Sequence, residues 1–187
     1  MPESAKPRRP DVDVVELIGG IEKRHLEVVD YDDRWPVVFA EHHERLVEAL
    51  EGESVDIEHI GSTSVPGLAA KPIIDIVVVV DDITAEEDYL PQLLATGYVL
   101  RVREPGHRLV RTPELDVHVH IYQKGDPAVT NYLLLRDRLR ADAGDRELYA
   151  RTKRELIAQG LDDMNAYSDA KSEVIAGILA RARASKS

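Results

Sequence analysis

One acidic residue interrupts the most apolar run of the chain. Asp75 lies within Ile73–Val80, whose β-branched residues are typical of a strand buried on both faces. Burying an unpaired carboxylate costs several kcal/mol. Asp75 is therefore expected either to border a cleft or to bind a cation, and it is the first candidate for a catalytic, metal-ligating residue. A salt bridge or a cap at the end of the strand is the structural alternative.

Two histidines form a second candidate site. Polar and apolar residues alternate strictly from Asp116 to Tyr122, which predicts a strand with Asp116, His118 and His120 on one face. Two imidazoles and a carboxylate suit Zn²⁺, Mn²⁺ or Fe²⁺ better than Mg²⁺. The histidines could also act as general bases or phosphate donors, and a polar strand face without chemistry remains open. His59, on an earlier strand, is expected to join this cluster.

A loop of small and hydroxyl residues precedes the apolar run. At Gly61, Ser62, Thr63 and Ser64 the backbone can approach a ligand closely and donate amide or hydroxyl hydrogens. A phosphate cradle and an ordinary turn both fit this composition. The stretch is neither a Walker loop nor a nucleophile elbow, because Gly-x-x-x-x-Gly-Lys and Gly-x-Ser-x-Gly are both absent from it.

Several cationic side chains could bind the phosphates of a ligand. For each of them a solvated surface role is an equal alternative. The main candidates are Lys71, Arg111 and Arg136, and the others are Arg108, Arg140, Lys153 and Lys171. Lys153 and Lys171 each follow a tyrosine by four residues, so each pair is expected to stack on one helix face.

The elements that must position these residues follow an α/β pattern up to about residue 125. Asp32 or Asp33 is expected to cap a helix that has Pro36 in its first turn and packs on the sheet. A capping box at Thr84 opens another helix, which Pro91 kinks or splits. Further expected elements are a short helix over 12–21 and strands over 26–31, 57–60, 73–80, 98–102, 108–111 and 116–122.

The chain is expected to become helical from Asp126. Asp126 and Pro127 combine a cap with a proline at the first helical position. A second helix, capped by Asp145, is expected to reach residue 159, and a third to span 164–184. The sequence therefore predicts a single α/β domain over 12–184, with an α/β part over 12–125 and a helical part over 126–184. A disordered tail is expected over residues 1–11.

The overall composition excludes some classes of protein. The 187 residues include 24 Lys and Arg against 35 Asp and Glu, a net charge of −11, which argues against a general nucleic-acid binder. Without cysteine there is neither disulfide nor thiol chemistry. With no signal peptide and no apolar run of membrane-spanning length, a cytoplasmic protein is expected. The oligomeric state is not indicated.

The stretch IEHIGSTSVPGLAAKPIIDI, over 57–76, resembles the signature of GrpB-like proteins, which are placed in the nucleotidyltransferase superfamily. The superfamily motif is a hydrophobic residue, Gly, Gly or Ser, a spacer, and then Asp-hydrophobic-Asp/Glu. Ile60, Gly61, Ser62 and Asp75 match it. The resemblance extends over about 26–182, and it implies a nucleotidyltransferase-like mixed β-sheet with flanking helices and a C-terminal helical bundle.

This resemblance implies a metal-dependent transfer of a nucleotidyl group from an NTP to an acceptor. Asp75 would hold Mg²⁺ or Mn²⁺, with Zn²⁺ as an alternative, and His118 and His120 would lie nearby. Gly61 and Ser62 would bind the phosphates. The sequence departs from the motif at one point, because Val77 replaces the second acid and puts a two-metal mechanism in doubt.

Two other functions remain open at this stage. The first is a non-catalytic nucleotide- or metabolite-binding module with a folding-accessory role, since related domains are found joined to dephospho-CoA kinases. The second is a mononuclear His/Asp metal enzyme of another class. The metal content discriminates between the three hypotheses. Two hard metals favour transfer, one softer metal favours the mononuclear enzyme, and none favours the binding module.

Overall fold

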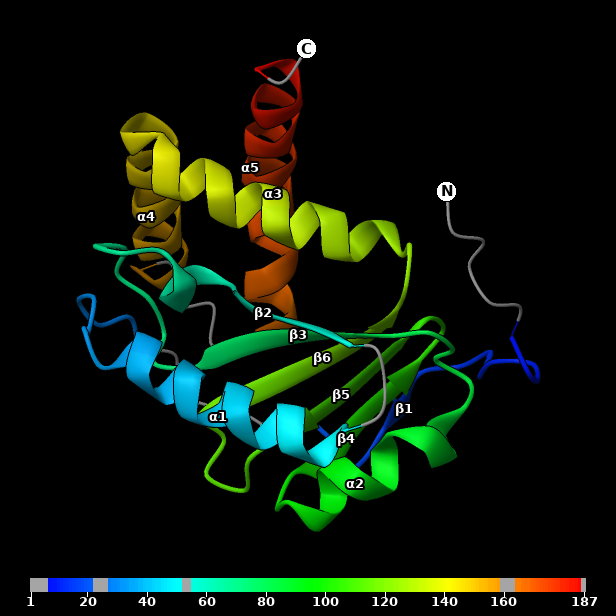
Figure 1. Ribbon diagram of the computed structural model, residues 1–187. Coiled ribbons are helices and arrows are strands. Elements are labelled where there is room, and N and C mark those ends of the chain that lie inside the picture. Colours follow the sequence, from blue (N-terminus) through cyan, green and yellow to red (C-terminus); the bar gives the residue numbers. More distant parts are fainter. Residues whose placement is uncertain (1–6, 22–26, 52–54, 159–163, 186–187) are drawn as a thin grey trace.

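The computed structural model describes residues 7–21, 27–51, 55–158 and 164–185, with no side-chain detail over 164–170. Its centre is one sheet in the order β1-β4-β5-β6-β3-β2 (Figure 1). Among the described strands the β3–β6 pair alone is parallel. The strands are β1 (Glu16–Leu17), β2 (Asp56–Ile60), β3 (Ile74–Val80), β4 (Val99–Glu104), β5 (His107–Arg111) and β6 (Val117–Gln123).

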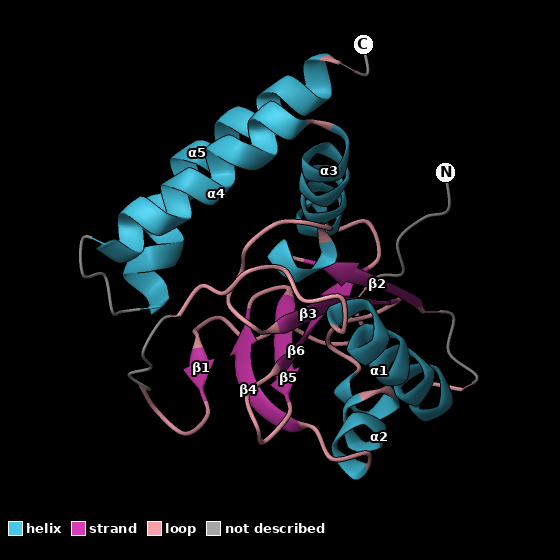
Figure 2. Cartoon of the chain, turned by 90° about the vertical axis from the view of Figure 1, so that its left-hand side faces the viewer, coloured by secondary structure: helices cyan, strands magenta, loops and turns pink. Residues whose placement is uncertain are grey.

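Helices cover both faces of the sheet (Figures 1 and 2). Two lie on one face, α1 (Trp35–Ala49) and α2 (Leu90–Ala95). Three lie on the opposite side, α3 (Pro127–Ala141), α4 (Ala143–Ala158) and α5 (Met164–Ala184). Two short 3₁₀ helices, Ser62–Ser64 and Glu86–Asp88, follow β2 and β3. The expected α/β fold, with a mixed sheet, flanking helices and three C-terminal helices, is confirmed.

The alternation of β3 explains its apolar run. Ile74, Ile76, Val78 and Val80 belong to the main core under α1 and α2, together with buried residues of both helices. Val77 points to the other face, where α3 covers it. Because helices cover both faces, nearly every position of this strand must be apolar. Asp75 is the exception, and it lines a cavity.

Two expected elements of the first part take other forms. Residues 12–21 contain no helix, because Glu16 and Leu17 pair with Arg103 and Val102 and add β1 to the sheet edge. Of the strand expected over 26–31, residue 26 lies outside the described residues. The rest contributes one isolated bridge, between Val29 and Ala70.

Three expected helix starts also differ. At α1 the cap position is held by Arg34, with no side-chain cap hydrogen bond, and not by Asp32 or Asp33. The amide and hydroxyl of Thr84 both donate to the Asp82 carboxylate, which makes a local turn instead of a capping box. The helix α2 begins later, and Pro91 lies in its first turn without kinking it. At the start of α4, the carboxylate that accepts an amide hydrogen belongs to Asp142 and not to Asp145. Asp126 caps α3 as expected.

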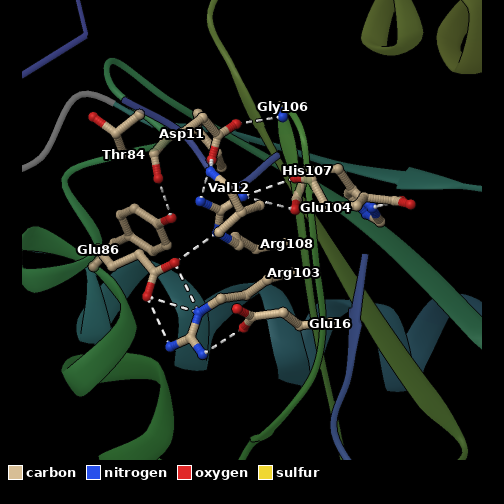
Figure 3. Close-up of polar contacts among 12 residues, drawn as sticks. Asp11, Val12, Glu16, Thr84, Glu86, Arg103, Glu104, Gly106, His107 and Arg108 are labelled. Atoms are coloured by element: carbon tan, nitrogen blue, oxygen red, sulfur yellow. Dashed lines mark hydrogen bonds and ion pairs between the residues drawn. The ribbon is translucent and has the colours of Figure 1, made fainter. Parts of the chain in front are cut away.

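An ion-pair network ties the segment before β1 to the sheet (Figure 3). Arg108, with a side chain only 2% exposed, contacts Asp11 at 2.5 Å and Glu86 at 2.7 Å. Arg103 joins Glu86 to Glu16. Of the tail expected over 1–11, residues 1–6 lie outside the described residues, whereas residues 7–11 contact the domain. No helix in the described part of the chain is long and apolar enough to cross a membrane.

Candidate functional site

The parallel pairing of β3 with β6 brings three candidate ligands together. Asp75 lies opposite His118 in the register, and His120 lies one pleat further along the same face. One ligand atom from each of the three lies within 4.8 Å of the other two. Asp75 Oδ1 is 3.7 Å from His118 Nδ1 and 3.4 Å from His120 Nε2. The three side chains expected on polar strand faces therefore lie close together.

This donor set fits one transition-metal ion. Metal bonds of about 2.1 Å at tetrahedral angles place ligand atoms roughly 3.4 Å apart, close to both distances at Asp75. The three side chains are partly exposed, with Asp75 at 30%, so an ion can reach them. Burial raises the pKa of Asp75, whereas His120 and His118, when they are protonated, and Lys171 lower it, and the net pKa lies below its ordinary value. The carboxylate is ready to bind a cation.

Val77 shows why one metal fits better than two. It lies on the same face of β3 as Asp75, but it is fully buried against Ile60, Tyr122 and side chains of α3. A carboxylate at this position would be shielded by the helix. Among the described residues, Asp75 is accordingly the one carboxylate that joins the two histidines in the cluster.

The turn after β2 brings the backbone against Asp75. Gly61 has φ of +73°, a conformation that favours glycine. It also has no room for a side chain, since a Cβ there would lie 2.7 Å from Asp75 Oδ2. Ser62 lies beside it, and its Oγ accepts a hydrogen bond from Lys153 at 3.1 Å. Both residues line the cavity in front of the cluster.

This cavity has a volume of about 640 Å³, within the range of small-molecule sites. Three lysines line it, and they come from three separate elements. Lys71 lies in the loop before β3, Lys153 on α4 and Lys171 on α5. The cavity therefore places cationic groups near an acid–histidine cluster, an arrangement that suits a phosphorylated ligand with a metal ion.

Lys153 is the most unusual of these lysines. It is only 2% exposed, and its Nζ donates to the Ala69 carbonyl at 2.6 Å. The Tyr149 ring lies under it, 4.9 Å away, which confirms the expected pair on one helix face. Burial, together with Lys171 and Lys71, lowers the pKa of Lys153 to about 7. Side-chain detail at residue 167, the partner expected for Lys171, lies outside the described residues.

The arginine candidates have different surroundings. Arg136 lines the cavity, where it pairs with Glu58 at 2.7 Å and Asp137 at 2.8 Å. Arg111 lies opposite His118 in the register but does not line the cavity. Arg108 and Arg140 do not line the cavity either, and both have contacts within the protein. Arg108 is buried in the network described above, and Arg140 donates to the Ser64 carbonyl at 2.9 Å.

His59 and Asp116 do not join the cluster. In the β2–β3 register Ile60 lies opposite Asp75, so His59 points to the other face and stacks on Phe39 of α1. Burial lowers the pKa of His59 to about 4, against the raising effect of Asp75. Asp116 precedes β6, and its carboxylate accepts from the Thr112 hydroxyl at 2.6 Å.

Two residues that the sequence did not single out border the cluster. His107 opens β5, and its Nε2 lies 3.1 Å from Nδ1 of His120. Its Nδ1 lies 2.5 Å from the Glu104 carboxylate, across the turn between β4 and β5 (Figure 3). Both residues line the same cavity. The available signal was an acid and a histidine spaced three residues apart between the strands expected over 98–102 and 108–111.

Comparison with known proteins gives one family. The family described as GrpB protein matches residues 25–181. A UPF0157 protein of Streptomyces coelicolor is 62% identical over 186 residues, which cover 100% of both chains. The crystal structure of the conserved protein GrpB from Enterococcus faecalis has 31% identity and a TM-score of 0.73, over 83% of this chain and 96% of that one.

A further relative is named for an enzymatic activity. A protein of Mycolicibacterium paratuberculosis named dephospho-CoA kinase is 28% identical over 176 residues. The match covers 79% of this chain and 43% of that protein. More than half of that kinase therefore lies outside the region that the two chains share.

Proposed function

This chain belongs to the GrpB protein family, and from that premise we propose that it uses a divalent metal ion to bind a nucleotide and transfer its nucleotidyl group to an acceptor. One observation carries the proposal. Asp75, His118 and His120 form a ligand cluster on the wall of a cavity that three lysines also line. A metal site facing cationic groups is the arrangement expected for a bound polyphosphate.

Asp75, His118 and His120 would hold the metal ion. Their chemistry favours Mn²⁺ or Zn²⁺ over a pair of Mg²⁺ ions, because imidazole is a softer ligand than carboxylate and Val77 supplies none. When bound, a divalent ion supplies Lewis-acid polarisation of a phosphoryl oxygen. Gly61 lets the carboxylate of Asp75 lie close to the backbone, so it helps to keep the cluster compact.

The lysines would neutralise the phosphates. Lys71, Lys153 and Lys171 line one cavity, and Ser62 and Gly61 border it. Because the pKa of Lys153 is about 7, this side chain is neutral in a fraction of the molecules at physiological pH. An anion beside Lys153 favours its charged form, so the binding of phosphate is expected to be accompanied by uptake of a proton.

In the proposed reaction, a hydroxyl oxygen of the acceptor forms a bond to the α-phosphorus of the NTP. The bond from that phosphorus to the bridging oxygen breaks, and pyrophosphate leaves with the electron pair. The hydroxyl proton passes to water. The role of the lysines is to neutralise the negative charge that develops on the departing phosphates.

A non-catalytic binding module is the second candidate. It is favoured by Val77, which leaves the cluster with one carboxylate where the superfamily motif has two. The relative named dephospho-CoA kinase suggests what such a module could bind, a nucleotide-like CoA precursor. Under this alternative the same cavity and the same lysines hold the ligand, and no transfer follows.

Ligand-induced shifts of the melting temperature test the binding step. We expect Mn²⁺ or Zn²⁺ to raise the melting temperature, and an NTP or dephospho-CoA to raise it further. The double variant His118→Ala/His120→Ala should abolish the metal-induced shift. Its stability without metal should be nearly unchanged, because substitutions of partly exposed residues usually cost little free energy of unfolding. Asp56→Asn, on the exposed end of β2, is the matched control. Loss of several kcal/mol without metal would make the histidine pair structural and contradict the proposal.

A further inference from the structure

A chain of three side chains leads from the rim of the cavity to the ligand cluster. The Glu104 carboxylate contacts His107 Nδ1 at 2.5 Å, and His107 Nε2 contacts His120 Nδ1 at 3.1 Å. His120 Nε2, at the other side of its ring, faces Asp75 Oδ1 at 3.4 Å. Stacking on Tyr122, with centroids 4.5 Å apart, holds the His107 ring in this orientation. Glu104 and His107 are thus one step removed from the proposed metal ligands.

The donors and acceptors of this chain fix the position of each proton. An ionised carboxylate accepts hydrogen bonds only, so the proton of a neutral His107 lies on Nδ1 and is donated to Glu104. His107 Nε2 then carries a lone pair and accepts. It follows that His120 donates from Nδ1, which leaves the lone pair of a neutral His120 on Nε2.

This proton order leaves an unfavourable contact. The Nε2 lone pair of His120 would face a carboxylate oxygen of Asp75 at 3.4 Å, and two acceptors at this distance repel each other. A cation between the two atoms converts the contact into an attraction. His118 Nδ1, at 3.7 Å from the same oxygen, is placed to share that cation.

We propose that Glu104 and His107 are positioning residues, which hold the proton of His120 on Nδ1 and thereby leave Nε2 to bind the metal ion. The proposal rests on the metal site of the proposed function and adds two residues to it. Partners that orient a ligating histidine typically change metal affinity by about 10- to 100-fold when they are removed. Neither residue need touch the nucleotide.

The proton position can be measured without a metal. Long-range ¹H–¹⁵N correlation spectra of the full chain at about pH 8, above the ordinary imidazole pKa of about 6.5, distinguish protonation at Nδ1 from protonation at Nε2. The His120 signals are assigned by their loss in His120→Gln. We expect Nδ1 protonation in the native chain and a shift to Nε2 in His107→Phe, which keeps the ring and removes the acceptor. His42→Phe is the control, because His42 is buried under the opposite face and contacts Tyr98. A native His120 protonated at Nε2 would overturn the proposal.

Titration with Co²⁺ as the probe tests the consequence for the metal. We expect about 10- to 100-fold weaker binding, with a changed visible spectrum, in His107→Phe and in Glu104→Ala. His107→Gln should recover much of the affinity, because its side-chain carbonyl can accept from His120. Glu104→Ala keeps the test valid if the Phe variant does not fold, since the Glu104 side chain is 39% exposed.

The two proposals fail differently in this titration. If the native chain binds no Co²⁺, the metal-dependent function is wrong, and the positioning role falls with it. If the native chain binds Co²⁺ and both His107→Phe and Glu104→Ala bind it equally well with the same spectrum, the positioning role alone is wrong.

Discussion

Asp75 Oδ2 lies so close to the backbone of Gly61 that a Cβ at residue 61 would come within 2.7 Å of it. Gly61 therefore meets two requirements at once, a left-handed φ of +73° and close contact with a proposed metal ligand. Other glycines of the chain also have a positive φ. The close contact is what links Gly61 to the position of the Asp75 carboxylate. The turn after β2 and the strand β3 must fit each other for the cluster to form.

Gly61→Ala should separate these two requirements. The new methyl group pushes the Asp75 carboxylate away from the histidines, so we expect Co²⁺ affinity to fall by at least about tenfold, as when a residue that orients a ligand is lost. Backbone strain adds about 1–3 kcal/mol of lost stability. Gly67→Ala is the matched control, because Gly67 has φ of +75° and nothing within 4 Å of its would-be Cβ. Equal metal affinity in Gly61→Ala and Gly67→Ala would show that the close contact has no role.

Lys153 predicts a specific dependence of stability on pH. Its pKa is about 7 in the folded chain against an ordinary 10.5, so between these values the unfolded chain holds a proton that the folded chain lacks. Stability therefore rises with pH in this window, by up to about 1.4 kcal/mol per pH unit, and the cost of the buried charge is fully felt below pH 7.

Urea unfolding of the native chain and Lys153→Met at several pH values tests this. The free energy of unfolding of the native chain, relative to the variant, should rise from pH 7 towards pH 10. A difference that stays constant or falls over that range would contradict the lowered pKa of Lys153.

Arg108 should stabilise the fold more than the site. Replacing it with Met removes the Arg108 cation from Asp11 and leaves Glu86 paired with Arg103 alone, and breaking such a buried pair costs about 3–5 kcal/mol. Co²⁺ affinity should fall less than in His107→Phe, because Arg108 contacts Glu104 and His107 only through their backbone carbonyls. Arg151→Met is the control, since its ion pair with Glu155 is exposed on both sides. Thermal unfolding that is equal in both variants would contradict the structural role of the network.

The sequence predicted which residues form the cluster better than it predicted which strands and side chains lie around them. Strict alternation over 116–122 places His118 and His120 on one face, and the apolar run around Asp75 predicts a buried strand. Both follow from the period of a strand alone. That the two strands are parallel neighbours, with Asp75 opposite His118, depends on the order of strands in the sheet, which no local pattern specifies.

The wrong predictions share this cause. His59 is expected in the cluster because an earlier strand carries it, but the pairing of β2 with β3 decides which face each residue occupies. Glu104 and His107 enter the site only because β5 lies beside β6. Arg108 is a suitable phosphate ligand by residue type, and only the placement of the segment before β1 shows that carboxylates already surround it.

Pyrophosphate release tests the account most directly. The four NTPs are incubated in turn with Mn²⁺ or Mg²⁺ and a cell-extract pool of acceptors, in the presence of the native chain, Asp75→Asn or the control Asp56→Asn. We predict release by the native chain and the control. We predict at least about hundredfold slower release by Asp75→Asn, because the amide keeps the shape of the ligand but loses its charge. Equal release by the native chain and Asp75→Asn would contradict the assignment of Asp75 as the metal ligand, and no release by any of the three proteins would contradict nucleotidyl transfer and favour the binding module.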